Sequence, residues 1–237
     1  MSAVFRLTLR QLTGRWRLAI MTVLAVLPVL FTRIMTGASS APWVGEFEDV
    51  VLGGMLAGAI APLIMVAIAT VAFGNEVEDR TLANLTLTPL SRWQIVLPKL
   101  AATVAVSAPF IVGCAFFTSL LAYNRDWTAV FAVTASTCAG ILMYAAVFLW
   151  LGLTVKYAIG AGLLYIVLWE GFFSGYVSGI RFLSIRHYAI ALMNGLDPRR
   201  FVGDPHVGLV GALTVSVGVV ALFGWLTTRR LRRMDVP

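Results

Sequence analysis

The chain has 237 residues, of which 59% are hydrophobic and 12% are charged, and its mean hydropathy is +0.89. A soluble domain of this length has too little interior to enclose so much apolar side chain, so the composition argues against a soluble globule and predicts a membrane protein. The net charge of +7 comes largely from Arg residues at the ends of apolar runs, a distribution typical of membrane proteins and not of proteins that bind nucleic acid.

The chain begins with a basic, amphipathic stretch. From Val4 to Trp16, apolar residues recur at near-helical spacing between Arg and Gln residues, which is typical of a helix that lies on the inner leaflet of a membrane. A plain basic helix beside the first span accounts for the same pattern, because segments on the inner side are rich in Arg and Lys. Both interpretations stay open. No small-residue cleavage site follows Phe31, so we interpret the first apolar run as a retained span.

Six apolar runs are candidates to cross about 30 Å of hydrocarbon as helices. The first is short and contains Pro28, and it spans only if the Arg residues at its two ends snorkel. The predicted fold is an all-α, polytopic membrane protein, with residues 1–237 forming a single transmembrane domain. The six predicted spans are 18–31, 51–73, 100–121, 130–155, 159–176 and 207–226.

Small residues follow one another along the second predicted span. Such residues let helix backbones approach closely inside a membrane. The pattern predicts close packing, either within the subunit or between two copies of it. The residues are Gly53, Gly54, Ala57, Gly58 and Ala61.

Basic residues predict the orientation of the spans. If both termini are cytoplasmic, the inner segments hold twelve Lys and Arg residues and the outer segments hold six, as the positive-inside rule requires. Four of the outer six lie between Val177 and His206, in a segment that is too long for a simple turn and apolar in places. We therefore expect ordered structure between spans five and six.

The segment between the second and third spans, residues 74–99, holds the densest group of charged residues in the chain. Acidic residues open it, and Leu82 and Leu85 at helical spacing predict a short cytoplasmic helix with one apolar stripe. Pro89 interrupts this helix. Ser91 is placed to cap the next helix, which continues into the third span.

This loop resembles the corresponding loop of the permease subunits of type 2 ABC exporters. Those loops contain an acidic cluster, Thr-Leu, Pro-x-Ser-Arg and a later Lys, in that order. Arg80 is a departure, because the family commonly has Gly before Thr-Leu. The residues that carry the resemblance are Glu76, Glu78, Arg80, Thr81, Leu82, Leu85, Pro89, Ser91, Arg92 and Lys99.

The resemblance implies that the loop forms a coupling helix, which docks in a groove of a separate ATP-binding subunit. Two copies of that subunit, which bind ATP and Mg, and a second permease copy are then the expected partners. The second copy is either identical, giving a homodimer, or a similar subunit. An apolar stripe with charges at its rim suits recognition of a helix in a groove. A solvated loop with helix caps is the alternative that the loop alone leaves open.

A second segment carries the same resemblance. Trp169-Glu170-Gly171 is followed by a run from Arg181 to Tyr188, and similar permeases often show W-E-x-x-x-S followed by L-S-I/P-x-x-Y. The resemblance implies a re-entrant hairpin between spans five and six. Glu170 is the only acidic residue well inside an apolar run, so we expect it, with Trp169, either to line a translocation path or to fix the hairpin. Satisfaction by backbone amides or by Arg181 near the outer interface is the purely structural alternative.

The predicted function is that of the permease subunit of an ATP-driven exporter in the cell membrane. The sequence contains no G-x-x-x-x-G-K-[ST] motif, so we expect no enzyme activity or cofactor in the chain itself. His187 and His206 have no partners at ligand spacing, so we expect no metal site. Two alternatives stay open: a mechanical or sensor membrane subunit of an ABC complex, and a membrane-embedded enzyme. The sequence does not identify a substrate.

Overall fold

The computed structural model describes residues 2–38, 47–78, 91–173, 183–201 and 207–233. Over these residues the chain is helical and contains no strand, which confirms the all-α prediction. In chain order the helices are α1 (Ser2–Leu12), α2 (Arg15–Ala38), η1 (Glu48–Ile60), α4 (Ala61–Ala69), α5 (Val71–Glu78), α7 (Trp93–Ala122), α8 (Trp127–Thr154), α9 (Ala158–Leu164), η2 (Tyr165–Phe173), α11 (Ile185–Leu196) and α12 (Leu209–Arg233), where η marks a π-helix.

Five stretches among the described residues are long and apolar enough to cross a membrane. They overlap the predicted spans one to four and six. The predicted fifth span, 159–176, corresponds to α9 and η2, whose apolar part covers only 158–171 and is shorter than the others. A sixth crossing therefore stays a prediction. The five long stretches are 15–37, 48–77, 93–122, 127–154 and 209–233.

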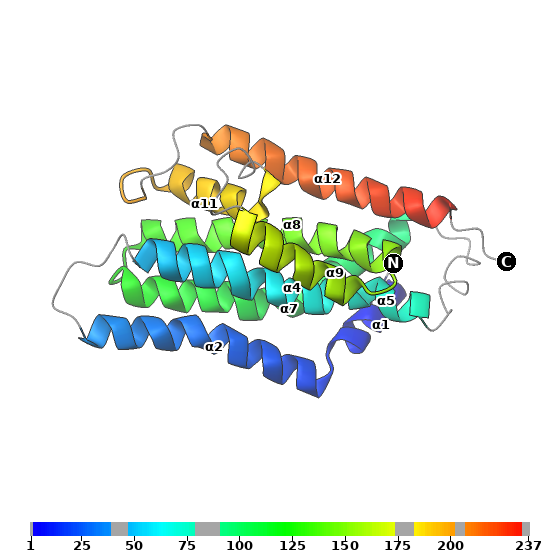
Figure 1. Ribbon diagram of the computed structural model, residues 1–237, viewed down its shortest axis with the longest axis horizontal. Coiled ribbons are helices and arrows are strands. Elements are labelled where there is room, and N and C mark those ends of the chain that lie inside the picture. The colour runs from blue at the N-terminus through cyan, green and yellow to red at the C-terminus, as the bar shows by residue number, and fades with distance from the viewer. Residues whose placement is uncertain (1, 39–46, 79–90, 174–182, 202–206, 234–237) are drawn as a thin grey trace.

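The long helices run side by side in a bundle, with α12 along one edge and α2 along the other (Figure 1). We call the end that carries α1 and the last turns of α12 the terminal end, and the opposite end the distal end (Figure 1). Helix α8 is central, because it packs against α7, α12, α11 and α4. Helices α9 and η2 start at the terminal end and stop partway along α8, and α11 runs from there to the distal end (Figure 1).

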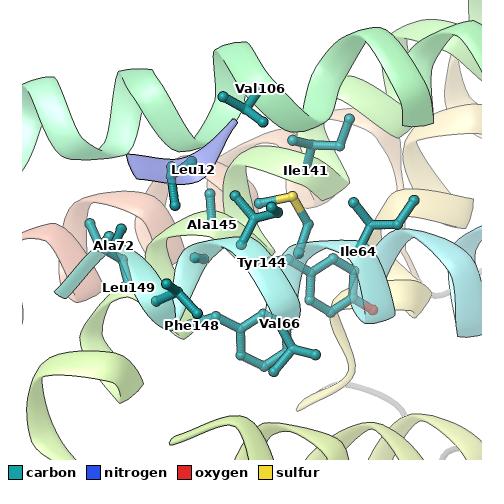
Figure 2. Close-up of a cluster of buried hydrophobic side chains, with 14 of the residues drawn as sticks. Leu12, Ile64, Val66, Ala72, Val106, Ile141, Tyr144, Ala145, Phe148 and Leu149 are labelled. Carbon is teal, nitrogen blue, oxygen red and sulfur yellow. The ribbon is translucent and has the colours of Figure 1, made fainter. Parts of the chain in front are cut away.

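Aromatic and branched side chains of α8 and α4 form the centre of the core. Tyr144 and Phe148 of α8 are stacked with ring centres 5.8 Å apart, and Ile64 and Val66 of α4 lie in the same cluster (Figure 2). Near the terminal end, α8 approaches Thr70, the C-cap of α4, so closely that a Cβ atom at Gly152 would lie 2.2 Å from the Thr70 carbonyl oxygen. Only glycine fits there.

The predicted amphipathic helix is present as α1, which ends at Leu12. Its buried residues, Val4, Thr8 and Leu12, follow one another at one-turn spacing, and α1 packs against α7 and α5. Leu7 is 59% exposed on the other side. The helix thus contacts the bundle through one stripe, and its place relative to a membrane stays a prediction.

Helices α2 and α12 expose apolar surface along most of their length. Val23 of α2 and Val217 of α12 are 63% and 67% exposed. Exposed apolar side chains on a long helix need lipid or a neighbouring subunit around them. The two edges of the bundle therefore suit hydrocarbon or a second membrane subunit, and not water.

Candidate functional site

A buried ion pair joins two helices near the terminal end of the bundle. Nζ of Lys99 in α7 lies 2.6 Å from Oε1 of Glu76 in α5. The same ammonium donates a hydrogen bond to the Ala72 carbonyl and lies 4.5 Å from the centre of the Phe73 ring. Lys99 is completely buried and Glu76 is 7% exposed. A carboxylate, a carbonyl and an aromatic face thus surround one buried ammonium.

This ion pair fixes the two ends of the segment that holds the predicted coupling helix. Helix α5 ends at Glu78, two residues after Glu76, and α7 begins at Trp93, six residues before Lys99. Breaking a buried ion pair leaves an uncompensated charge away from water, so the two partners hold each other firmly. The ion pair therefore holds the end of α5 to the first turns of α7.

The other predicted coupling residues divide into two groups. Glu78 is the last residue of α5, and Ser91 and Arg92 immediately precede α7. The Ser91 amide donates to Oε1 of Gln94 at 3.2 Å, but the N-cap of α7 is Arg92, so the predicted capping of α7 by Ser91 is not seen. Arg80, Thr81, Leu82, Leu85 and Pro89 lie outside the described residues, so the coupling helix stays a prediction.

Glu170 of η2 is completely buried, and its carboxylate accepts hydrogen bonds from two parts of the chain. Oε1 accepts from the Tyr165 hydroxyl and from the Ile185 amide, each at 3.0 Å. Oε2 accepts from the Ser184 hydroxyl at 2.5 Å. The carboxylate thus connects η2 to the first residues of α11.

The neighbouring contacts strengthen the same junction. Ser184 is the N-cap of α11 and accepts from the His187 amide at 3.2 Å, so Glu170 lies at the positive end of that helix. Nε1 of Trp169 donates to the Leu183 carbonyl at 3.3 Å. Because the Glu170 carboxylate is enclosed, this geometry favours the role of fixing η2 to α11 over the role of lining a path. Both roles stay predictions.

A second polar cluster, which the sequence did not reveal, lies at the distal end. The Tyr123 hydroxyl donates to Oε1 of Glu48 at 3.3 Å, and the Arg200 guanidinium lies 4.4 Å from the Tyr123 ring centre. Arg200 also forms an ion pair with Asp126 at 2.9 Å, and Phe201 packs edge-on against Tyr123 at 5.6 Å. Burial, followed by the nearby Glu48 carboxylate, raises the pKa of Tyr123, so its hydroxyl stays a neutral donor.

The described residues contain no group of three or more His, Cys, Asp or Glu side chains placed to hold a metal ion. The notable arrangements are therefore the Glu76–Lys99 ion pair, the Glu170 junction and the distal cluster. The sequence named Glu76, Lys99 and Glu170 but did not pair Glu76 with Lys99. The sequence did hold a signal for this pair, because Glu76 and Lys99 belong to the same loop pattern. An acidic and a basic residue on either side of one loop can form an ion pair.

Comparison with known proteins supports the assignment that these features suggest. Residues 9–185 match the family model described as ABC-2 family transporter protein. No curated protein matches the chain at a significant level. The matched region extends from α1 to the start of α11 and contains both the Glu76–Lys99 ion pair and the Glu170 junction. Since the match covers well over half of the chain, the chain belongs to the ABC-2 family of transporter proteins, as a membrane-spanning permease subunit that works with an ABC ATP-binding subunit.

Proposed function

We propose that this chain is the permease of an ATP-driven exporter in the cell membrane, with both termini in the cytoplasm. In the active complex, two ATP-binding subunits bind ATP and Mg and dock on two permease copies, most simply as a homodimer. The observation that carries the proposal is the buried ion pair between Glu76 and Lys99, which closes the base of the loop between α5 and α7.

The ion pair supports coupling for a mechanical reason. A helix docked on a moving partner transmits motion only if its ends are fixed to the membrane helices. Here the attachment lies within two residues of the end of α5 and within the second turn of α7. Displacement of a docked loop would therefore move both helices, which belong to the predicted spans two and three.

Exposed apolar helix edges support a complex with a second permease copy. Helices α2 and α12 have little of their apolar surface covered within one subunit. Six predicted crossings, with α8 as the central one, also leave little room for a substrate path inside a single copy. A path between two copies follows from this argument, and the proposed homodimer provides it.

Docking can be tested with the chain and its ATP-binding subunit expressed together. Leu82→Asp with Leu85→Asp places two carboxylates on the apolar stripe of the predicted coupling helix, so we expect the pair to stop co-eluting. Leu82→Met with Leu85→Met keeps the stripe apolar and is expected to co-elute as before. Each variant must retain the elution volume of a folded membrane protein. Co-elution of the double Asp variant at the original level would contradict the proposal.

Export itself needs a second measurement. Inside-out vesicles that contain the complex should accumulate substrate on addition of ATP, and should stop doing so with the double Asp variant. ATP hydrolysis that persists without substrate movement would instead favour a mechanical subunit of an ABC complex.

A further inference from the structure

Helix α12 ends in a group of exposed arginines at the terminal end of the bundle (Figure 1). The helix contains no acidic residue, and no carboxylate in the described part of the chain forms an ion pair with any of these arginines. Leu231, which lies among them, is buried in the core, so the end of α12 is fixed to the bundle while its charges face away from it. The exposed arginines are Arg229, Arg230, Arg232 and Arg233.

Three tryptophans from three helices lie at one level of the bundle, just before these arginines. Trp225 belongs to α12 itself. Trp150 of α8 packs edge-on against Phe223 of α12, with ring centres 5.5 Å apart. A Cβ atom built on Gly224 would lie 3.7 Å from the indole ring of Trp93, the first residue of α7. Tryptophan side chains gather at the boundary between hydrocarbon and water, so this level of α12 marks the membrane surface at the terminal end.

One face of α12 presents apolar, aromatic and cationic side chains in that order along the helix. Val217, Leu222 and Trp225 are all exposed. Arg229 and Arg232 follow Trp225 by four and seven residues, which is the spacing of neighbours on one helix face. The guanidinium carbon of Arg229 lies 5.0 Å from the centre of the Trp225 ring. The exposed apolar surface is therefore continuous with the charged end of the helix.

The rise of the helix places these charges at the depth of lipid headgroups. At about 1.5 Å per residue, Arg229 lies about 6 Å beyond Trp225 along the helix axis, and Arg232 lies about 10 Å beyond it. The headgroup layer on each side of a bilayer is about 5–7 Å thick, and arginine side chains are long enough to reach back toward it. The guanidinium groups thus lie beside phosphates, and the apolar side chains before Trp225 lie beside acyl chains.

We propose that this face of α12 binds an anionic phospholipid, with Arg229 and Arg232 on its headgroup phosphate and with Val217 and Leu222 against its acyl chains. A guanidinium offers paired donors that match phosphate oxygens, and basic residues directly beyond a membrane-spanning helix attract anionic headgroups. The apolar part of the face favours a lipid over a free phosphate, which has no acyl chain to cover it. This inference goes beyond the proposed export function and does not depend on it.

The test uses the full chain alone in nanodiscs of phosphatidylcholine and phosphatidylglycerol. Cys114→Ala and Cys138→Ala remove the native thiols, and Leu222→Cys labelled with bimane places a fluorophore beside the proposed acyl chains. Bromine atoms on the acyl chains of one lipid or of the other quench this fluorophore on contact. The two quenching curves give the relative affinity of the lipids, and we expect phosphatidylglycerol to be favoured by about tenfold.

Substitutions then show whether the two arginines cause the preference. Arg229→Gln with Arg232→Gln is expected to reduce it to near one, and Arg229→Lys with Arg232→Lys, which keeps both charges, is expected to retain most of it. The matched control is Arg10→Gln with Arg15→Gln, which removes two exposed charges from α1 and α2 and should leave the preference unchanged. Because all these side chains are exposed, each variant should keep the elution volume of the folded protein.

A second reporter separates a local site from a general effect of lipid charge. Bimane at Leu213→Cys lies on the half of α12 nearer the distal end, so its quenching should not change with the arginine substitutions. Equal affinity for the two lipids in the chain with all its arginines would overturn the proposal. An equal loss of preference in the Arg10 and Arg15 control would also overturn it, because the attraction would then belong to the whole terminal end. Neither result bears on the docking experiment with the ATP-binding subunit.

Discussion

Lys99 is a residue type that is rarely buried completely, and it lies inside an apolar helix. Its contacts explain how the bundle tolerates it, since the ammonium is matched by Glu76, the Ala72 carbonyl and the Phe73 ring. An apolar side chain of similar size would avoid the desolvation cost of both charges. The presence of the pair is therefore better explained by what it connects than by stability alone.

The ion pair can be tested by thermal unfolding. Lys99→Met leaves the Glu76 carboxylate buried without a partner, so we expect a loss of about 3–5 kcal/mol. Adding Glu76→Gln removes the stranded charge and should recover much of that loss. Cys114 is buried, so its reaction with a fluorogenic maleimide reports unfolding in a Cys138→Ser background. Equal melting temperatures for the single and double variants would show that the two charges are not coupled.

The sequence placed Glu76 and Lys99 in one functional segment but did not show that they touch. Contact between them depends on how α5 and α7 pack, which no local pattern contains. Arg186 was counted among the outer basic residues, because nothing in its sequence neighbourhood shows that α11 begins near the midpoint of α8. The sequence thus identified single charged residues, but it did not identify their partners or their positions along the bundle.

At the scale of helices, hydrophobic run length predicted most of the fold. The long spans were identified because a helix that crosses hydrocarbon must be apolar along its whole length. The π-helical geometry of η1 and η2 was not predicted, since it has no residue pattern that distinguishes it from an α-helix. The last residues of the predicted fifth span, 174–176, lie outside the described residues, so where this span ends stays a prediction.

Close packing of α8 on α4 makes a direct prediction about Gly152. Gly152→Ala places a Cβ atom against the Thr70 backbone, so overpacking should destabilise the protein by about 1–3 kcal/mol. Gly113→Ala in α7 is the matched control, because no atom lies within 4 Å of its added Cβ. There, helix propensity predicts a gain of up to about 1 kcal/mol. Both are measured by the Cys114 assay, and similar effects of the two substitutions would contradict the packing described here.

At the scale of the whole molecule, the arrangement of helices makes the two ends of the bundle chemically distinct. Lys156 follows α8 at the terminal end, and Arg199 follows α11 at the distal end, and both are exposed. If the terminal end faces the cytoplasm, a membrane-impermeant maleimide should label Arg199→Cys in intact cells and Lys156→Cys only after permeabilisation. Cys114→Ala and Cys138→Ala provide the background. The reverse labelling pattern would invert the proposed orientation.

Helix α7 is held at both ends by the two polar clusters. Lys99 ties its beginning to α5, and Tyr123, directly after its last residue, contacts Glu48 and Arg200 at the distal end. A helix of 30 residues is about 45 Å long and resists compression along its axis. Under the proposed function, displacement at the loop would be passed to the distal end along α7, which is continuous from Trp93 to Ala122 and contains Pro98 and Pro109. If the proposed coupling operates, the distal cluster would receive the movement that ATP binding starts at the other end of α7.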